Sequence, residues 1–329
     1  MRESETLDVD QLRADVVNLA YAHGRMVGTP GHVQAREYIL GRIQQVALDP
    51  YAHGAYEFAY PAGEIKLTNV LARLPGVRRS LPPILIAAHY DTCGPLPGAD
   101  DNASAIAIAL DMVAPLRERQ LHRDVIFAFF DAEEPPHFLK PTMGSTYYYQ
   151  NQRDEPIHCA VVLDLLGHDV PIPEYEDMLY VMGMESDADF AGVIEDTPLP
   201  DKLRVAAVPN RYIGDMSDHH VFRTHGRPYL FFSCGQWEHY HLPTDTPEKL
   251  NYAKMRRISE YLVDVVAAVS SEPLIGPFEG YDSTPHELGL MKKHAGALAA
   301  QLGLMLESQS DLQRFVETLV MRYGLLTDR

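Results

Sequence analysis

The sequence is poor in cysteine and tryptophan, and it contains no long apolar run. Its 329 residues include three cysteines and one tryptophan. Three cysteines cannot build a disulfide framework, so we expect reduced thiols. No stretch of about 18 apolar residues is present, and the polar segment 1–5 lacks the apolar core of a signal peptide. We therefore expect a cytoplasmic protein without a membrane-spanning helix.

Positive charge is also scarce. The chain has 28 Lys and Arg against 46 Asp and Glu, which gives a net charge of −18. Such a surface repels nucleic-acid phosphates and anionic lipid, so neither a nucleic acid nor a membrane is an expected partner. The length allows about two domains. Hydrophobic residues make up 46% of the chain, which is enough to bury a large core.

Alternating strand and helix patterns predict an α/β fold. Continuous apolar runs at 84–88, 125–130 and 160–163 are typical of strands buried on both faces, and a helical pattern at 106–116 separates the first two. Thr29-Pro30 and Thr246-Pro247 each read as an N-cap followed by a first-turn proline. Further strands are expected at 56–60, 69–74, 178–183, 203–208 and 228–233. The prediction is a three-layer α/β/α sandwich with a mostly parallel mixed sheet.

The end of the chain has a different character. Residues 271–286 hold three prolines and two glycines and read as a linker, which divides a main domain, 1–272, from residues 273–329. Helices are expected at about 287–306 and 310–325. Apolar side chains recur at helical spacing there: Leu288, Met291, Ala295, Leu298 and Leu302. We expect a C-terminal helical extension that covers the main domain or forms a homodimer contact.

Histidine and carboxylate side chains follow three of the predicted buried strands. His89 and Asp91 follow the first strand, Glu133 and Glu134 follow the second, and Asp164 ends the third. Because ligand sites in open α/β sheets lie at the carboxyl ends of the strands, we expect these groups to meet at one edge. Buried charges are costly there unless they are paired or bind a metal.

Two more polar segments fit the same edge. Asp100 and Asp101 lie between the first buried strand and its helix. Adjacent carboxylates repel each other, and a bound cation would relieve that repulsion. His241 lies in a loop before a predicted helix, where taken alone it reads equally well as an exposed histidine.

Taken in order, these segments resemble the co-catalytic zinc aminopeptidase family. This family includes bacterial leucyl aminopeptidases and is related to glutamate carboxypeptidases and glutaminyl cyclases. The resemblance covers about residues 10–270 and implies the zinc-exopeptidase fold. The matching segments are residues 25–31, 89–91, 98–104, 131–134, 144–145, 164, 217–219 and 241–246.

The resemblance implies a site for two metals with a general base beside it. Asp101 would bridge the metals, Glu133 would be the base, and Asp91 would hold the ring of His89 through its other nitrogen. A cis peptide bond after Asp101 is also implied. The implied metal ligands are His89, Asp101, Glu134, Asp164 and His241.

The chemistry of these residues agrees with that assignment. Two imidazoles and three carboxylates suit two Zn²⁺ ions per chain, with Co²⁺ or Mn²⁺ as possible substitutes. Two metals about 3.5–4 Å apart can activate a water. Glu133 can take the proton of that water and return it to the leaving amine. The Tyr240 hydroxyl is a candidate donor to the oxyanion, although it could equally be a packing aromatic. We expect a metallopeptidase that hydrolyses the N-terminal bond of short peptides.

Other functions stay open at this point. A glutaminyl cyclase would share the His-Tyr-Asp and Glu-Glu segments but use one zinc, with tryptophan around the site. A carboxypeptidase would hold the substrate's terminal carboxylate with an arginine such as Arg211 or Arg223. A non-catalytic module on this fold would have lost ligands. The loop 135–143, with three prolines, is expected to shape the pocket, and Cys93 reads as a buried or semi-buried thiol.

Overall fold

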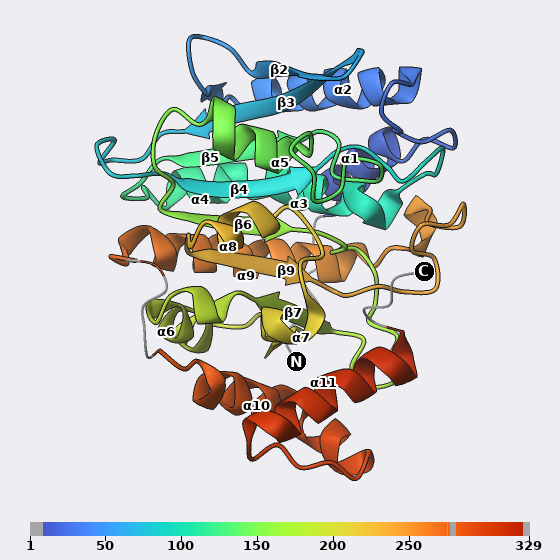
Figure 1. Ribbon diagram of the computed structural model, residues 1–329, viewed down its shortest axis with the longest axis vertical. Helices are drawn as coiled ribbons and strands as arrows, with labels where there is room; N and C mark the ends of the chain where they lie inside the picture. Colours follow the sequence, from blue (N-terminus) through green and yellow to red (C-terminus); the bar gives the residue numbers. More distant parts are fainter. Residues whose placement is uncertain (1–8, 275, 277–280, 325–329) are drawn as a thin grey trace, which may run out of the picture.

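A computed structural model describes residues 9–274, 276 and 281–324, which fold around one twisted sheet (Figure 1). In this described part nine strands run in the order β1-β3-β5-β4-β6-β9-β7-β8, with β2 paired to β3. The strands are β1 (Asp49–Pro50), β2 (Glu57–Ala62), β3 (Ile65–Leu74), β4 (Ile84–His89), β5 (Val125–Phe130), β6 (Cys159–Leu163), β7 (Met178–Met182), β8 (Arg204–Ala207) and β9 (Tyr229–Ser233).

The centre of the sheet is parallel and fully buried. β4 pairs in parallel with β5 and β6, and β6 pairs in parallel with β9. Every residue of these four strands is buried, which confirms the interpretation of the continuous apolar runs. The register places His89 opposite Phe130. The carboxyl ends of the central strands therefore meet at one edge of the sheet. β3 joins β5 antiparallel, and β7 joins β9 antiparallel, so the sheet is mixed.

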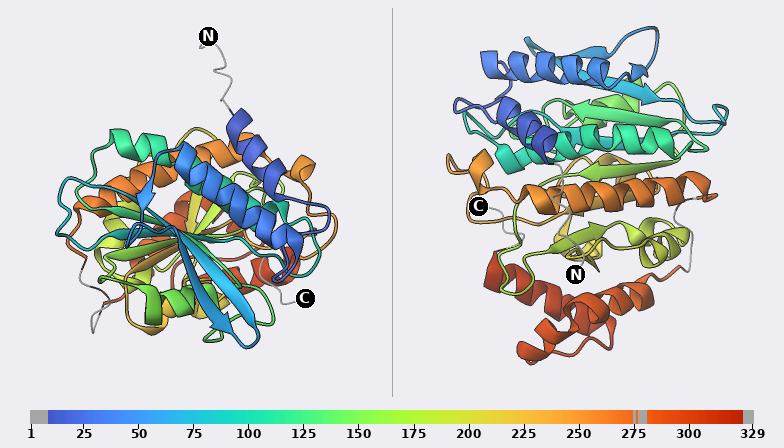
Figure 2. Two further views of the ribbon diagram at one scale, coloured as in Figure 1. Left: turned by 90° about the horizontal axis from the view of Figure 1, so that it is seen from above. Right: turned by 180° about the vertical axis from the view of Figure 1, so that it is seen from behind.

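Helices cover both faces of the sheet, as the two further views show (Figure 2). One face carries α1 (Asp10–Leu19), α2 (Pro30–Gln45), α3 (Ala105–Asp111), α4 (Val113–Glu118) and α9 (Tyr252–Ser271), with α6 (Asp189–Asp196) packed against α9. The other face carries α5 (Gly144–Tyr147), α7 (Asn210–Ile213) and α8 (His220–Thr224). The three-layer α/β/α prediction is confirmed. No helix among the described residues is long and apolar enough to cross a membrane.

The Thr-Pro capping pattern predicted the start of one helix correctly and that of another wrongly. Thr29 caps α2, because its side chain accepts a hydrogen bond from the His32 N–H. The same Thr-Pro signature at Thr246 does not start the long helix. It starts a three-residue 3-10 turn, Pro247–Lys249, and α9 begins after Asn251, whose side chain accepts from the Lys254 N–H. A short turn and a long helix need the same first turn, so the cap signature could not distinguish them.

Two helices, α10 (Thr284–Gln301) and α11 (Gln309–Tyr323), follow the main sheet. They lie at the β8 edge of the molecule, where α10 packs against β8 (Figure 1). Leu288, Met291 and Ala295 on α10 are buried in the same hydrophobic core as the sheet. The apolar stripe thus covers this chain's own sheet edge. A homodimer through these helices stays a prediction.

Candidate active site

The structure brings the five predicted ligand side chains together where the strands end. His89 is the last residue of β4, Glu134 follows β5, and Asp164 follows β6. The His89 Nε2 lies 3.2 Å from Asp101 Oδ1 and 3.6 Å from Asp164 Oδ1. The His241 Nε2 lies 3.1 Å from Glu134 Oε1. These residues come from segments up to 152 positions apart, 241 − 89.

Asp101 is the centre of this cluster. Its Oδ1 faces His89, and its Oδ2 lies 3.1 Å from the His241 Nε2. Each carboxylate oxygen therefore faces a different imidazole, which is the placement a bridging ligand needs. The peptide bond between Asp101 and Asn102 is cis, as the resemblance implies.

Buried carboxylates on neighbouring loops hold the cluster in place. Asp91 accepts hydrogen bonds from the backbone N–H groups of Glu133 and Glu134, at 2.9 and 3.1 Å. Its Oδ1 lies 3.4 Å from the Nδ1 of His89, just beyond ordinary hydrogen-bond distance. Asp91 therefore fixes the two glutamates through their backbone, in addition to lying beside the histidine ring.

Asp100 and Asp101 have different surroundings. The Asp100 carboxylate turns away from the cluster, with an oxygen 2.6 Å from the Nδ1 of His168 and another accepting from the Gly167 N–H. Asp245 accepts from the backbone N–H groups of both Asp100 and Asp101. His168 and the Gly167 N–H thus hold the Asp100 carboxylate, and of the two adjacent aspartates only Asp101 faces the cluster.

Arg25 holds the loop that ends at Asp101 through hydrogen bonds to its backbone carbonyls. This fully buried guanidinium donates to backbone carbonyls on separate segments, among them that of Asp101. The others are the carbonyls of Leu19, Tyr90, Pro97 and Gly98. Gly98 has φ +60°, and a Cβ there would lie 2.3 Å from the Asp101 carbonyl oxygen. The turn before Asp101 thus requires glycine, and Arg25 ties it to the first helix.

Negative charge dominates the cluster. Burial, reinforced by neighbouring carboxylates, raises the pKa of Glu133 well above its ordinary value and that of Glu134 to about 7. Burial opposes the charged form of Asp101 too, but hydrogen bonds from His241 and His89 lower its pKa. Burial alone would lower the pKa of His89, yet the nearby Glu133 and Asp164 charges raise it. The cluster contains more carboxyl groups than its two imidazoles can neutralise. A bound cation would therefore stabilise it.

Specific atoms also fit a metal. Asp164 Oδ1 is buried and has no hydrogen-bond partner among the described residues. His89, Asp101 and Asp164 present ligand atoms that all lie within 4.8 Å of one another. Imidazole nitrogen and carboxylate oxygen together suit zinc and related divalent ions. The described residues therefore form a candidate metal-binding site.

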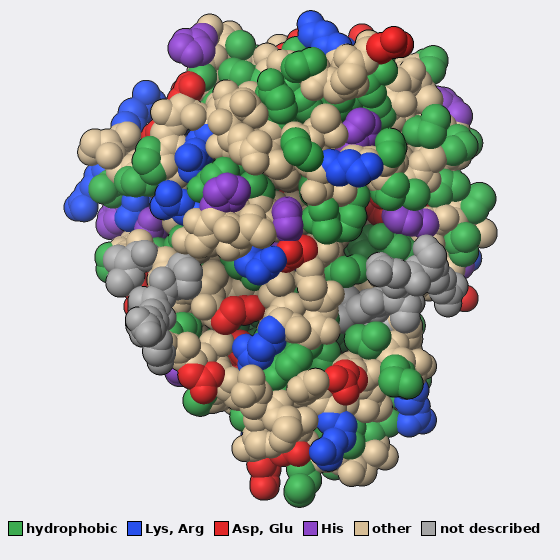
Figure 3. Space-filling model, in the orientation of Figure 1, with side chains coloured by type: hydrophobic (Ala, Val, Ile, Leu, Met, Phe, Trp, Pro, Cys, Tyr) green, Lys and Arg blue, Asp and Glu red, His purple; other side chains and the backbone are tan. Residues whose placement is uncertain are grey.

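A cavity of about 530 Å³ leads away from this cluster. Its polar end contains Glu133 and Tyr240 together with the predicted ligands. Its other walls are largely apolar. Hydrophobic side chains are also common along the right-hand side of the face drawn in Figure 3. The apolar walls come from Phe138, Leu139, Leu165, Tyr180, Met182, Val208, Ile213, Met216, Phe231, Val316, Leu319 and Val320.

Tyr240 reaches the cluster from the loop that carries His241. The two rings stack with centroids 3.8 Å apart. Burial, followed by the charges of Asp101 and Glu134, raises the pKa of Tyr240. Its hydroxyl therefore keeps its proton and can donate a hydrogen bond inside the cavity.

Other predicted features have clear places. Phe138 and Leu139 of the proline-rich loop line the cavity, as the pocket-shaping expectation requires. The single tryptophan, Trp237, stacks on His168 with ring centroids 4.7 Å apart and is not among the described residues that line the cavity. Neither arginine suggested for binding a terminal carboxylate lines the cavity. Arg211 bonds Glu287 and Thr284, and Arg223 pairs with Asp215.

Sequence reasoning missed three contributors to the site. Asp245 and Arg25 position Asp101, and only their full burial reveals that role. Helix α11 supplies Val316, Leu319 and Val320 to the cavity wall. The apolar stripe found in the sequence, Leu288 to Leu302, belongs to the preceding helix α10, and for α11 only a helix was expected.

The fold and the cluster together define a zinc-exopeptidase architecture with a candidate metal centre. A profile of peptidase family M28 matches residues 69–266, and the chain belongs to that family. The crystal structure of a Zn-dependent exopeptidase from Parabacteroides distasonis has the same fold, with a TM-score of 0.63 and 15% identity over 79% of this chain and 98% of that one. A glutaminyl cyclase from Tannerella forsythia is equally similar, with a TM-score of 0.63, 17% identity and the same coverage.

The relatives found by sequence match this chain over only part of their own length. The protein YfbL of Escherichia coli, which is described as uncharacterized, is 26% identical over 56% of this chain and 66% of its own length. The aminopeptidase YwaD of Bacillus subtilis is 24% identical over 56% of this chain and 40% of its own. The chain thus spans 66% or less of the curated relatives that it matches first.

Proposed function

We propose that this protein is a zinc-dependent aminopeptidase that removes N-terminal residues from short peptides and prefers a large apolar first side chain. His89, Asp101 and Asp164 would hold one Zn²⁺, and Asp101, Glu134 and His241 would hold a second. Co²⁺ or Mn²⁺ could substitute. Membership of a peptidase family supports hydrolysis of peptides, and the Bacillus relative is named as an aminopeptidase.

The shape and lining of the cavity carry the proposal. An acidic cluster at one end attracts the free amine of a peptide, and apolar walls beyond it accept a large side chain. None of the described residues that line this cavity is Lys or Arg. A terminal carboxylate would find no cationic partner there, which argues against a carboxypeptidase.

The residues around the cluster divide the chemistry between them. When bound, the two metals would polarise the scissile carbonyl and lower the pKa of a water. Glu133 lies at the cluster and lines the cavity, so it can take the proton from the attacking water and return it to the leaving amine. The Tyr240 hydroxyl would donate to the oxyanion that develops on the carbonyl. Asp91 keeps the Glu133 backbone in place during these steps.

Glutaminyl cyclase activity is the second candidate, because solved glutaminyl cyclases share this fold. Such an enzyme would release ammonia from an N-terminal glutamine instead of cleaving a peptide bond. Asp101 faces both imidazoles here, which favours two metals over one.

Mass spectrometry on a peptide panel tests these alternatives directly. The zinc-loaded protein is incubated with peptides that carry free N-termini, acetylated N-termini or N-terminal glutamine. We expect stepwise loss of residues from free-amine peptides only, fastest where the first residue is leucine, methionine or phenylalanine. Ammonia loss from the glutamine peptides alone would establish the cyclase instead, and cleavage of acetylated peptides would refute recognition of the amine.

A further inference from the structure

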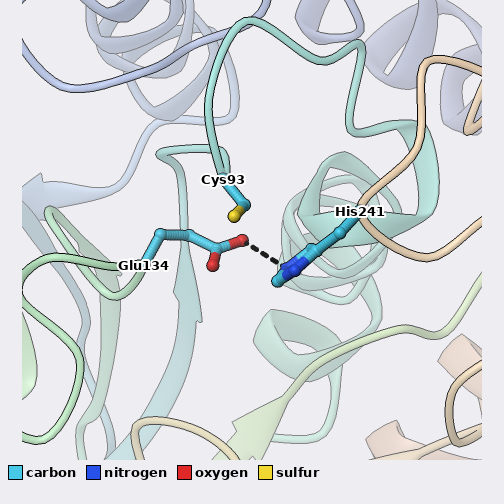
Figure 4. Close-up of side chains that lie close together, drawn as sticks. All are labelled: Cys93, Glu134 and His241. Carbon is cyan, nitrogen blue, oxygen red and sulfur yellow. Dashed lines mark hydrogen bonds and ion pairs between the residues drawn. The ribbon is translucent and has the colours of Figure 1, made fainter. Parts of the chain in front are cut away.

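Cys93 lies beside two of the five predicted ligands. Its sulfur, a Glu134 carboxylate oxygen and a His241 ring nitrogen all lie within 4.8 Å of one another. Figure 4 shows these three side chains pointing toward a common space from three separate loops. Cys93 is a partly exposed free thiol, whereas Cys159 and Cys234 are free and buried. The position of Cys93 thus differs from that of the other two cysteines.

The loop around Cys93 is held on both sides. The Thr92 hydroxyl accepts a hydrogen bond from the Arg25 N–H at 2.8 Å and donates one to the Gly94 carbonyl at 2.9 Å. The Arg25 side chain is fully buried and bonds the Tyr90 carbonyl on the same segment. The sulfur is therefore presented by a fixed backbone on the side that faces the cluster.

We propose that Cys93 is an additional metal ligand at the Glu134 and His241 end of the cluster. The thiol would lose its proton to solvent and bind as a thiolate. That end would then offer four protein ligands, Asp101, Glu134, His241 and Cys93, the number typical of a closed zinc site. The other end, with His89, Asp101 and Asp164, would offer three and keep room for a fourth ligand. The inference rests on the proposed metal site, and it does not depend on which peptide bond is cleaved.

Unequal ligands give the two ends unequal metal preferences. A thiolate is a soft ligand that favours zinc or cobalt over manganese, whereas a site of two carboxylates and one imidazole discriminates less. The Cys93 end should therefore fill first and keep zinc when manganese is offered in excess. Replacing Cys93 by serine should weaken the zinc affinity of this end of the cluster by at least about tenfold. Removing a group that is only hydrogen-bonded to a metal ligand already costs that much.

Cobalt absorption tests the ligand without any activity measurement. Metal-free protein is titrated with Co²⁺, and the near-ultraviolet charge-transfer band of a cobalt–thiolate bond is recorded. We expect the band to grow with the first equivalent and to be absent in Cys93→Ser, which still contains Cys159 and Cys234. No band in the unmodified protein, or an undiminished band in Cys93→Ser, would overturn the proposal.

Thiol reactivity supplies a second readout on the same protein. In native metal-free protein one thiol should react rapidly with 5,5′-dithiobis(2-nitrobenzoate), because two of the three cysteines are buried. One equivalent of Zn²⁺ should slow that reaction at least about tenfold if the metal binds the sulfur. Unchanged reactivity with zinc bound would overturn the proposal.

The outcomes separate this inference from the proposed function. A cobalt–thiolate band without release of N-terminal residues would keep Cys93 as a ligand and remove the aminopeptidase. Release of N-terminal residues without the band would do the reverse. The variant Cys93→Ala, analysed beside Cys93→Ser, controls for a weak interaction of the serine hydroxyl.

Discussion

The cavity has two walls of opposite character, and only the apolar wall includes residues from outside the family match. One wall lies at the ends of the central strands, within residues 69–266 that match the family profile. Its side chains are charged, and the Asp91 and Asp245 carboxylates hold its backbone by accepting hydrogen bonds from the N–H groups of Glu133 and Asp101. The other wall includes α11, which lies outside that match and is held by apolar packing.

Under the proposed function, we expect this difference to separate catalysis from substrate selection. A polar wall with fixed charged groups acts on any peptide that reaches it, so changes there should affect all substrates alike. An apolar wall contributes area that only large side chains contact, so changes there should alter the ranking of substrates. Three substitutions test this separation and a fourth tests how the C-terminal helices are attached, from the largest expected effect to the smallest.

Glu133→Gln should have the largest effect. It removes the proton acceptor while keeping the shape of the side chain, and general-base catalysis contributes about 10²–10⁴-fold. We expect kcat/KM to fall by about a thousandfold for alanyl and leucyl substrates equally, with zinc content per chain unchanged. A loss confined to one substrate would break the proposed separation, and retained activity would reject Glu133 as the base.

Tyr240→Phe should have the next largest effect. It deletes the hydroxyl and leaves the ring that stacks on His241. Loss of one donor to an oxyanion costs about 10²-fold or more in kcat. We expect kcat to fall by about a hundredfold with KM little changed, measured with the same two substrates. A change in KM alone would assign Tyr240 to packing or substrate binding.

Val320→Trp should change selection without changing the chemistry. Val320 lines the cavity from α11 and is only partly buried, so a larger side chain can extend into the cavity. We expect kcat/KM to fall about tenfold for phenylalanyl and leucyl substrates and by less than about twofold for alanyl substrates. The matched control is Met321→Trp on the same helix, where the native side chain is 85% exposed. An equal fall in kcat/KM for all substrates would show that α11 does not distinguish between their first side chains.

Glu287→Gln should have the smallest effect, seen in stability against pH. Glu287 joins α10 to the main sheet region through Arg211, at 3.3 Å, and burial raises its pKa to about 7 from 4.5. Folded protein therefore binds this proton more tightly than unfolded protein, and stability falls as pH rises from about 4.5 to 7.

Glutamine is neutral at every pH, so the variant does not lose this stability as the pH rises. Between pH 5 and pH 8 the variant should gain about 1 kcal/mol in free energy of unfolding relative to the unmodified protein, or about 2 °C in Tm. Thermal unfolding at both pH values measures it. An identical pH dependence in the two proteins would show that Glu287 does not change its protonation on folding.

The sequence was most informative where buried strands end. Apolar runs such as 125–130 predict buried strands. Because the central strands are parallel, the residues that follow them, such as Glu133 and Asp164, lie at one edge of the sheet. A carboxylate in a loop gives no such signal. Asp245 lies in the matching segment 241–246, but no role was assigned to it, because its burial depends on contacts with Asp100 and Asp101 from 144 and more positions away.

The remaining features depend on packing between distant segments. The pattern of apolar residues predicted C-terminal helices near the observed bounds, but nothing local to α11 indicates that Val316 and Leu319 face a cavity. Thr246-Pro247 failed as the start of α9 because it begins only a three-residue 3-10 turn, in which the Thr246 side chain makes no capping hydrogen bond. Cys93 was read correctly as a semi-buried thiol, while its approach to Glu134 depended on how three loops fold together.

The contribution of α11 also orders events in time. The ribosome makes this helix after every described strand and after the charged side chains of the cluster. A chain that has not yet reached residue 309 lacks Val316, Leu319 and Val320, which form part of the apolar wall. We therefore expect a molecule truncated before α11 to discriminate less between first side chains than a molecule that contains this helix.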